Sequence, residues 1–512
     1  MKNNNSQNSR RIAKNTWMLY IRMIFTILIS LYTSRVVLEV LGISDFGIYN
    51  VAAGFVTMFG ILSNSMSNAT QRFLTFEIGK NDSIQLGRVF SMSVNIHYVI
   101  AFVIVLLAET VGLWFVYNKL TIPVERHQAL MWVYQFSILT FVFNVISVPY
   151  NAIIIAHEKM KVFAVIGIIE VSLKLILVFM LQWLTFDKLK LYAFLMFLVS
   201  LIIRIIYTVY CRQNIKESKY AFFWDLNLFK KLLQFASWNL FGNSAVLMYG
   251  QGLNILLNIF FGPIINASYG IAYRLQAMVN NFVINFQTAL NPQIIKSYAS
   301  GDMTYMFDLI YKGAKYSLFL IFIFALPVVL ETQTLLEIWL KTVPEYAAVF
   351  TQLMLINVVL SNLSGSLGVA AQATGNIKIY QIVIGILLIL IIPVSFIFLK
   401  LGFNPQVVFY VSIVTSVISL FLRLLIVRGL IGIKIRDYLL EVVIRAGGVC
   451  ILSIILPFCL HYYLEIGLLR LFVVSLATLF SISFFVYLLG LDATEKMFIR
   501  ENIIKIKNKF HE

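Results

Sequence analysis

Charged residues are scarce in this chain. They make up 12% of its 512 residues, whereas soluble domains carry about 25%. Acids are especially few, with 23 Asp and Glu against 40 Lys and Arg, while 60% of the residues are hydrophobic. This composition excludes an ordinary soluble domain and predicts an integral membrane protein.

The motifs of common enzymes are absent as well. The 3 cysteines and 5 histidines follow no metal-binding or disulfide spacing, and no nucleophile stands beside a base at a recognisable spacing. A Gly-rich phosphate-binding loop that ends in Gly-Lys-Ser/Thr is missing, which argues against an ATPase. We therefore expect a protein that is not an enzyme and that uses no metal and no cofactor.

Long hydrophobic runs fill the sequence instead. A membrane-spanning helix needs about 20 mostly apolar residues, and about fourteen such stretches follow one another along the chain. The connections between them are short, so little is left for a soluble domain. The runs predict an all-α polytopic membrane protein with about 14 transmembrane helices.

The formal net charge of +17 follows the predicted topology. When the connections are assigned to alternate sides of the membrane, one side receives most of the Lys and Arg together with both termini. The positive-inside rule places that side in the cytoplasm. We therefore expect two cytoplasmic termini, and we attribute the excess charge to topology rather than to a nucleic acid partner.

The two halves of the sequence resemble each other. Residues 46–49 read Phe-Gly-Ile-Tyr, and residues 269–273 read Tyr-Gly-Ile-Ala-Tyr. Gly42 and Gly262 each precede a tyrosine of these motifs by seven residues. The offset is near 220 residues, as a repeat of six helices would give, and an even number of helices makes the two copies parallel.

A second echo, between residues 156–163 and 373–380, supports the same repeat. Residues 221–233 are both aromatic and basic, which predicts a helix that lies in the membrane interface. The predicted domains are an N-terminal six-helix lobe (1–213), an interfacial amphipathic linker (214–232), a C-terminal six-helix lobe (233–432), two additional transmembrane helices (433–490) and a basic cytoplasmic tail (491–512).

Seven cations lie inside the predicted spans. A charged side chain at the bilayer centre costs about 2.5 to 3.5 kcal/mol, so such residues usually face a protein-lined or water-filled interior. Their sign suits an anionic cargo, and the planar guanidinium group matches a phosphate. The seven residues are Arg22, Arg35, Lys174, Arg204, Arg274, Arg423 and Arg445.

Some of these cations have a simpler explanation. Glu170 precedes Lys174 by four residues, and Glu441 precedes Arg445 by four, which is the favourable order for an ion pair within a helix. Glu170, Lys174 and Arg204 are therefore candidates either for ion coupling or for a structural role, since Arg204 can also extend toward the headgroups.

The strongest candidates for binding the cargo are arginines without an obvious acid nearby. Arg22 and Arg274 meet this criterion, whereas Arg35 can pair with Glu39 four residues later. We expect these arginines, together with Arg204 and with Lys174 near mid-depth, to form a graded series of sites for a phosphate-bearing head group.

Amide side chains gather at helical spacing on three of the predicted spans. Amides both donate and accept hydrogen bonds, so they can match sugar hydroxyls without adding charge. They can equally bond to each other between helices, at about 0.6 kcal/mol each. The candidates are Asn64, Asn68 and Gln71, then Asn281, Asn285 and Thr288 as their counterparts in the repeat, and Gln251, Asn254 and Asn258.

Several of these features together resemble a known superfamily. They are the segment Ser34-Arg35 to Phe46-Gly47-Ile48-Tyr49, its echo from Gly262 to Tyr273, the Asn291-Pro292 pair and the number of spans. The chain resembles the polysaccharide-transporter branch of the multidrug/oligosaccharidyl-lipid/polysaccharide exporter superfamily. The resemblance covers essentially the whole chain.

The resemblance implies a flippase of the bacterial inner membrane. Its cargo would be an undecaprenyl-pyrophosphate-linked oligosaccharide, such as an O-antigen repeat unit of lipopolysaccharide or a capsule unit, moved by alternating access through a cationic central cavity. Arg22, Arg35 and Arg274 look like the cavity arginines of relatives that flip lipid II. The expected partners are this lipid-linked oligosaccharide, membrane lipids and a polysaccharide polymerase complex, with the protein itself monomeric.

Two other functions remain open at this stage. A multidrug and toxin extruder shares the fold, but exporters of cations rely on buried acids, and the clearest buried acid here, Glu170, lies beside Lys174. A polysaccharide polymerase or ligase would need a large external loop for its chemistry. The predicted outward loops, such as residues 116–126 and 331–345, are short.

Overall fold

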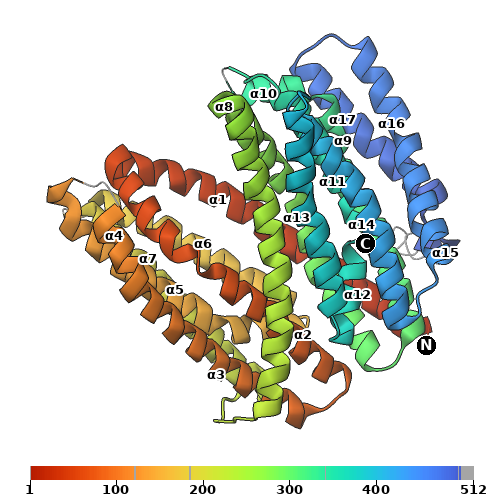
Figure 1. Cartoon of the computed structure of the whole chain (residues 1–512). Coiled ribbons are helices and arrows are strands. Elements are labelled where there is room, and N and C mark those ends of the chain that lie inside the picture. The colour runs from red at the N-terminus through yellow and green to blue at the C-terminus, as the bar shows by residue number, and fades with distance from the viewer. Residues whose placement is uncertain (1, 120–122, 184–185, 341, 494, 498–512) are drawn as a thin grey trace, which may run out of the picture. The chain divides into compact units, whose positions relative to one another are not determined.

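A computed structural model describes residues 2–119, 123–183, 186–340, 342–493 and 495–497, apart from the side chains of residues 2–10 and 43. Every regular element in these ranges is a helix, as the hydrophobic runs predict (Figure 1). Most of the predicted basic tail, residues 498–512, lies outside the described residues.

The first half of the chain contains seven α-helices and three short segments of other helix types. They are α1 (Lys2–Thr57), α2 (Gly60–Gly79), α3 (Ser83–Leu107), the π-helical segment η1 (Ala108–Gly112), α4 (Leu113–Lys119), η2 (Val124–Arg126), α5 (His127–Ala156), α6 (Met160–Trp183), α7 (Lys188–Asn214) and η3 (Lys216–Ser218).

The second half is built in the same way. Its elements are α8 (Leu226–Ala299), α9 (Met303–Leu330), α10 (Thr332–Trp339), α11 (Ala347–Asn362), α12 (Gly365–Thr374), α13 (Lys378–Lys400), α14 (Val407–Ile431), α15 (Ile435–Tyr438), η4 (Leu439–Ile444), α16 (Arg445–Tyr463), α17 (Leu468–Phe485) and η5 (Val486–Gly490).

The described residues hold 11 helices that are long and apolar enough to cross a membrane, or 13 when two bent pairs are each counted as one span. The helix α8 counts once in this total, although its 74 residues would extend roughly 110 Å. A bilayer with its headgroups measures only about 40–45 Å. Because the backbone of α8 is not helical at Gly262, it divides into two spans there, which agrees with the predicted number.

The two glycines of the sequence repeat are the two breaks in the long helices. Gly42 interrupts α1 with φ 75° and ψ 167°, and Gly262 interrupts α8 with φ 80° and ψ −170°. Both conformations have positive φ, which costs least for a residue without a Cβ atom. The echo in sequence therefore marks the same kink in both halves.

The repeat continues past the kinks. Asn81 and Gly301 both have positive φ, and they are followed by Asp82 and Asp302. Each aspartate caps the next helix by accepting a hydrogen bond from a backbone N–H three residues later. These positions keep the same offset as the two glycines, so the first 40 or so residues after each kink are equivalent without insertions.

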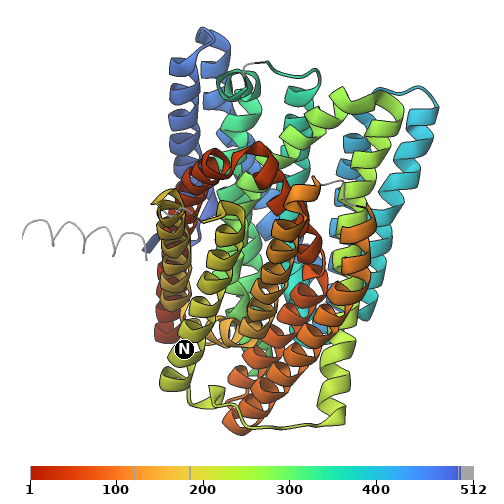
Figure 2. The same cartoon turned by 90° about the vertical axis from the view of Figure 1, so that its left-hand side faces the viewer.

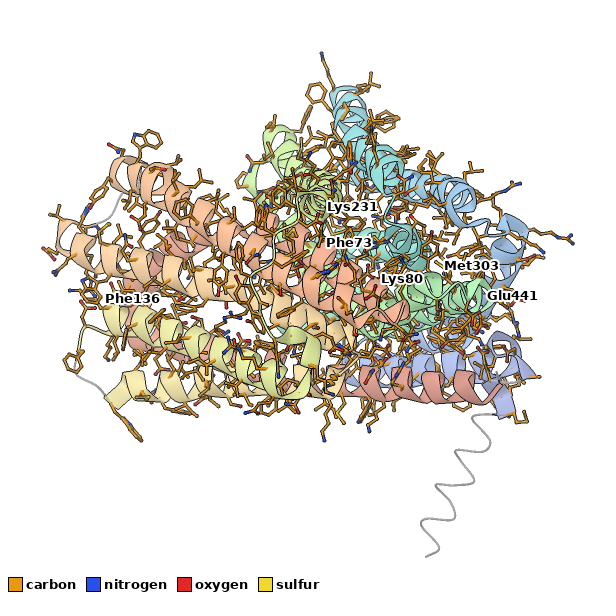
Figure 3. All side chains as sticks on the ribbon, turned by 90° about the horizontal axis from the view of Figure 1, so that it is seen from below. Phe73, Lys80, Phe136, Lys231, Met303 and Glu441 are labelled. Carbon is orange, nitrogen blue, oxygen red and sulfur yellow. The ribbon has the colours of Figure 1, made fainter. Side chains whose placement is uncertain are left out.

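The chain divides into two compact units. The N-terminal unit contains residues 12–243 and 295–301, and the C-terminal unit contains residues 1–11, 244–294 and 302–512. Both ends of α8 thus belong to the N-terminal unit. They pack on α2, where Phe73 meets Phe235 and Phe76 meets Tyr298. Figure 3 labels Phe73 of α2 and Lys231 of α8 in this region.

In the N-terminal unit, α5 packs along α2, α3 and α7, and α6 packs against α7 (Figures 1 and 2). In the C-terminal unit, α11 packs on α9 and α14, and α13 packs on α14. The last two helices, α16 and α17, pack on each other and on α9. They form part of the C-terminal unit and have no separate core.

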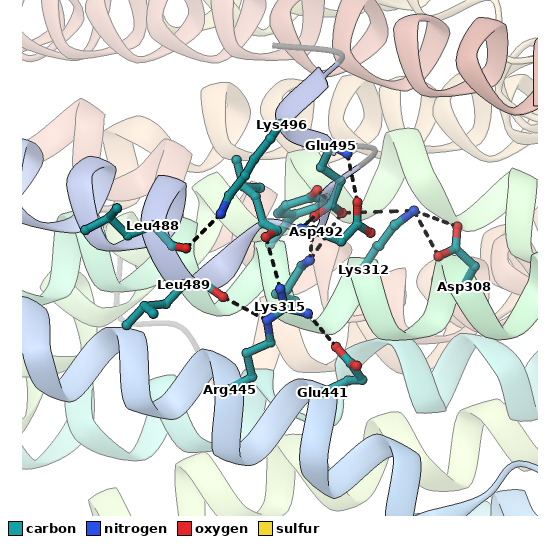
Figure 4. Close-up of polar contacts among 12 residues, drawn as sticks. Asp308, Lys312, Lys315, Glu441, Arg445, Leu488, Leu489, Asp492, Glu495 and Lys496 are labelled. Carbon is teal, nitrogen blue, oxygen red and sulfur yellow. Dashed lines mark hydrogen bonds and ion pairs between the residues drawn. The ribbon is translucent and has the colours of Figure 1, made fainter. Parts of the chain in front are cut away.

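Charged groups join the last helices to α9. Glu495 accepts hydrogen bonds from Lys315 at 2.9 Å and from Tyr316, both on α9 (Figure 4). Arg445 pairs with Glu441 at 2.9 Å, as their spacing predicts, and it also donates to the carbonyl oxygens of Leu489 and Leu491. These carbonyl groups, at and just after the end of η5, are therefore satisfied by a guanidinium group.

The predicted interfacial helix, residues 221–233, begins five residues later than predicted. Residues 219–225, here called the strap, form no helix, the two ends of the strap, Lys219 and Asp225, have extended backbone, and α8 begins only at Leu226. Asn95 on α3 explains the difference, because its side chain donates to the carbonyl oxygen of Phe223 at 2.8 Å and accepts from the hydroxyl of Tyr220 at 2.8 Å. These side-chain bonds replace those that a helix would form within its own backbone.

Candidate functional site

Arg22 of α1 lies against α6. Its guanidinium carbon is 4.1 Å from the centre of the Phe163 ring, close enough for a cation–π contact. Gly167 lies on the same face of α6, and a methyl group there would be only 2.5 Å from Nε of Arg22. The guanidinium group of Arg22 thus packs on the ring of Phe163 and occupies the space left by the missing side chain of Gly167.

A second cation and an acid lie beside Arg22. Glu170 and Lys174 form the ion pair that their spacing predicts, with 2.6 Å between Oε1 and Nζ, and both remain partly exposed. Glu170 and the hydroxyl of Tyr207 on α7 also interact electrostatically with Arg22. Arg22 itself forms no ion pair in the described part of the chain, so this group of side chains keeps a net positive charge.

Arg204 of α7 occupies a different position. It is buried, with 9% of its surface exposed, and its guanidinium carbon is 4.2 Å from the centre of the Tyr150 ring. Its Nη1 atom has no hydrogen-bond partner among the described residues. No described contact joins Arg204 to Arg22 or to the pair of Glu170 and Lys174.

Arg35 and Arg274 are exposed on their helices. Arg35 follows Arg22 along α1, and Arg274 lies on α8 in the C-terminal unit. Within the described ranges neither guanidinium forms an ion pair, and the pairing of Arg35 with Glu39 does not occur. Both guanidinium groups therefore lie at the helix surface without a carboxylate partner among these residues.

The predicted amides lie at or near the helix surfaces. Asn64, Asn68, Gln251, Asn258 and Asn281 are exposed, and Gln71, Asn254, Asn285 and Thr288 are partly buried. Some of these residues bond within their own helix, as Asn285 does to the carbonyl oxygen of Asn281. Asn64, Asn68 and Gln71 have no hydrogen-bond partner among the residues that the structure describes.

The proposed match between the amide triplets is displaced by three residues. Since the kinks and the caps on either side keep an offset of 220 residues, from 42 to 262 and from 82 to 302, Asn285 corresponds to Ser65 and Thr288 to Asn68. The two helices are equivalent, but their amides point in different directions. Matching spacing alone could not reveal this shift.

The C-terminal unit has further polar contacts between its helices. Tyr249 donates to Ser412 at 3.1 Å, which joins α8 to α14. Ser416 donates to Asn357 at 2.7 Å, which joins α14 to α11. These side chains bond to one another and serve as links between helices.

Sequence reasoning missed one acid inside a span. Glu109 lies in the π-helical segment η1, where Gln135 of α5 donates to it at 3.2 Å, and within the described ranges it has no cationic partner. Segments of π-helix inside α-helices are frequent at functional sites. A search of every span for acids, as was done for cations, would have found it.

A buried charged cluster at the far end of α9 was also missed. Glu331 has a fully buried side chain that binds Arg470 at 2.9 Å and His461 at 2.7 Å, and it accepts from Thr334 at 3.0 Å. The residues come from four different helices or their connections, so no spacing in the sequence points to the cluster.

The described residues contain no group of three or more His, Cys, Asp or Glu side chains that could hold a metal ion. The three cysteines are free thiols, two buried and one exposed. The cations described above are thus the main chemical feature of the spans.

The chain was compared with known families and structures. Residues 12–297 match a family described as polysaccharide biosynthesis protein. A comparison with curated proteins finds no match.

Several solved transporters share the fold. An outward-facing multidrug resistance MATE family transporter of the MOP superfamily is 13% identical, with a TM-score of 0.69 over 83% of this chain and 96% of the other. The MATE transporter ClbM in complex with Rb⁺ is 13% identical, with a TM-score of 0.70 over 83% of this chain and 96% of the other. A MOP superfamily transporter from Pyrococcus furiosus, whose binding pocket is described as reversed in polarity, is 14% identical. Its TM-score is 0.66 over 83% of this chain and 96% of the other.

The family match extends over more than half of the chain and the structural similarity over most of it. This polytopic membrane protein therefore belongs to the polysaccharide biosynthesis protein family and has the fold of the MATE transporters.

Proposed function

We propose that the protein is a transporter that moves an undecaprenyl-pyrophosphate-linked oligosaccharide across the bacterial cytoplasmic membrane. The cargo passes by alternating access through a cationic cavity. The family match supports a role in polysaccharide biosynthesis, and the fold supports transport. The sugar of the cargo, the monomeric state, the cytoplasmic position of both termini and a polymerase partner belong to the same proposal.

The observation that carries this proposal is the state of three arginines. Arg22, Arg35 and Arg274 lie within candidate spans, and none of them forms an ion pair in the described part of the chain. An unpaired charge within a span is costly, so it is retained where it meets water or an anionic ligand. A pyrophosphate supplies the missing negative charge and accepts paired hydrogen bonds from a guanidinium group.

The rest of the lipid-linked sugar also finds suitable partners. The unbonded amides of Asn64, Asn68 and Gln71 can donate to and accept from sugar hydroxyls. Gln251, Asn254 and Asn281 carry the same amide groups in the second half, whereas the amide of Asn285 donates to the carbonyl oxygen of Asn281. Amide side chains can bind different sugars, because they are uncharged and both donate and accept hydrogen bonds.

A multidrug extruder is the main alternative on this fold. A cationic drug would need a free acid, but Glu170 is occupied by Lys174 at 2.6 Å and Glu331 by Arg470 at 2.9 Å. Glu109 is the acid that most favours this alternative. The relative from Pyrococcus furiosus, described as having a pocket of reversed polarity and a different function, supports reading the sign of the pocket as a guide to the cargo.

The proposal is tested by deleting the gene and measuring how much lipid-linked glycan remains on the cytoplasmic leaflet. We expect lipid-linked glycan to accumulate on the cytoplasmic leaflet, and we expect the wild-type gene to relieve it. Variants Arg22→Ala, Arg35→Ala and Arg274→Ala should restore export poorly. Arg423→Ala is the matched control, since Arg423 is an arginine within a span that is bonded to Ser419 at 3.1 Å. Drug sensitivity without stranded glycan would favour the extruder and contradict the proposal.

A further inference from the structure

The strap, residues 219–225, has one side fixed to the N-terminal unit. Asn95, which is 7% exposed, binds both Phe223 and Tyr220. The backbone N–H of Ala221 donates to Ser91 at 3.4 Å, and the guanidinium carbon of Arg88 is 5.5 Å from the centre of the Phe223 ring. All three anchoring residues belong to α3, so the strap is held in one orientation.

The other side of the strap is apolar and exposed. Exposure alternates along the strap, since Phe223 is partly buried against Arg88 of α3 while Phe222 and Trp224 on either side of it are exposed. Phe222 is 78% exposed and Trp224 48%. The Trp224 ring stacks on Phe229 with 5.3 Å between centres, which holds it in place.

Five cations flank these aromatic residues. All are exposed, and none forms an ion pair with the described residues: Arg212, Lys216, Lys219, Lys230 and Lys231. The two acids of this region are partly buried, and Asp225 is occupied as the cap of α8, where it accepts from the N–H of Leu228 at 2.8 Å. The surface therefore has a net positive charge around an apolar centre.

The position of the strap brings this surface to the membrane boundary. It is the short connection between two candidate spans, 188–214 and 226–299. Figure 2 shows it running along one end of the helices. Aromatic side chains favour the headgroup region of a bilayer, and lysines beside them attract anionic lipids.

We propose that the strap and its flanking cations form a binding surface for anionic phospholipid. Phe222 and Trp224 enter the acyl boundary, and Lys219, Lys230 and Lys231 contact the phosphates. The occupant is a lipid rather than a soluble protein because the surface combines exposed aromatics with free cations directly between two spans. This surface is distinct from the arginines of the proposed function, and it binds lipid whatever the cargo is.

The depth of Trp224 tests the apolar half of the proposal. Full-length protein and its Trp224→Phe variant are reconstituted in phosphatidylcholine vesicles with brominated acyl chains, with and without phosphatidylglycerol. The difference between the two emission signals isolates Trp224 from the other tryptophans. We expect this signal to be quenched, and more strongly when phosphatidylglycerol is present. A signal that bromine does not quench and that aqueous acrylamide does quench overturns the proposal.

The lysines test the charged half. The triple variant Lys219→Gln, Lys230→Gln, Lys231→Gln should retain roughly fivefold less phosphatidylglycerol than wild type, measured by native mass spectrometry of the purified protein. The control is Lys188→Gln, which removes an exposed lysine at the other end of α7. Because these side chains are exposed and unpaired, the variants should fold as wild type does by circular dichroism. Equal lipid retention in the triple variant and the control contradicts the proposal.

Discussion

The guanidinium group of Arg22 lies against α6 because residue 167 is a glycine. A methyl group there would come within 2.5 Å of Nε of Arg22 and force the arginine to move. We predict that Gly167→Ala impairs export nearly as much as Arg22→Ala, with a loss of stability of about 1–3 kcal/mol from overpacking. Complementation of a deletion strain measures export, and denaturant unfolding in detergent measures stability.

Gly54→Ala is the matched control for this substitution. Gly54 lies on α1 with open space around its Cβ position, so an added methyl group should be tolerated. The double variant Gly167→Ala, Arg22→Ala should recover stability, because the clash is removed, but it should not recover export. Normal export by Gly167→Ala alone would show that the position of Arg22 against α6 does not affect export.

His157 lies between α5 and α6 and is sensitive to pH. Burial lowers its pKa below the usual value, and Lys296 and Lys159 lower it further. The unfolded chain therefore binds a proton more readily than the folded one, so the contribution of His157 to stability is present above about pH 6.5 and is lost as the pH falls below that value.

We predict that this dependence disappears in His157→Gln. The free energy of unfolding is measured in detergent between pH 7.5 and about pH 5, and the wild type should lose more stability over this range than the variant. Equal losses in the two proteins would mean that the buried imidazole is not responsible.

The charged residues of the site were only partly predictable from sequence. The spacing of four residues identified the pair of Glu170 and Lys174, because both partners lie on one helix turn. The contact of Arg22 with Phe163 and Gly167 joins residues more than a hundred positions apart. Such a contact depends on how α1 packs on α6, which no local pattern encodes.

Among the helices, α3 and α9 are equivalent in the repeat, and each has an aspartate as its N-cap. Asp82 and Asp302 accept from the N–H groups of Gln85 and Tyr305 at 2.9 and 3.0 Å. We predict that Asp82→Ala and Asp302→Ala each cost about 1 kcal/mol, because each leaves the same N–H group without its partner. The measurement is the free energy of unfolding, and clearly unequal losses would contradict the structural equivalence of the two caps.

The last two helices depend on a buried acid. Glu331 is fully buried beneath Arg470, so Glu331→Gln should cost about 3 kcal/mol by leaving that cation uncompensated. Hydrogen exchange should rise in α16 and α17, which pack on α9. Glu337→Gln, at an exposed glutamate of α10, is the control and should change little. Unchanged exchange in Glu331→Gln would show that the helices are held by packing alone.

Most helices could be predicted because their apolar runs are long and their connections short. The kinks at Gly42 and Gly262 were marked by the repeated motif around them. The strap was not predictable, since its non-helical form depends on Asn95 of another helix. The bend of 47° between α1 and α2 was missed as well. The sequence is equally apolar on both sides of the break, so its composition does not reveal the bend.

Across the whole molecule, some charges are paired inside the protein and others are not. The ion pairs of Lys315 with Glu495 (Figure 4) and of Arg470 with Glu331 neutralise charge inside the C-terminal unit. Arg22, Arg35 and Arg274 are left without ion pairs in the described part of the chain. Among the acids of the spans, Glu170 and Glu441 are paired within their own helices. We propose that the three unpaired arginines bind a pyrophosphate.

The most direct test measures the affinity of purified protein in nanodiscs for an undecaprenyl pyrophosphate lipid. We predict that Arg22→Ala, Arg35→Ala and Arg274→Ala each weaken binding roughly 10- to 100-fold, as loss of a charged hydrogen bond does, while Arg423→Ala binds as wild type does. Undecaprenol without the pyrophosphate should bind weakly to all of them. Equal affinity for the two lipids, or wild-type affinity in all three arginine variants, would contradict the account.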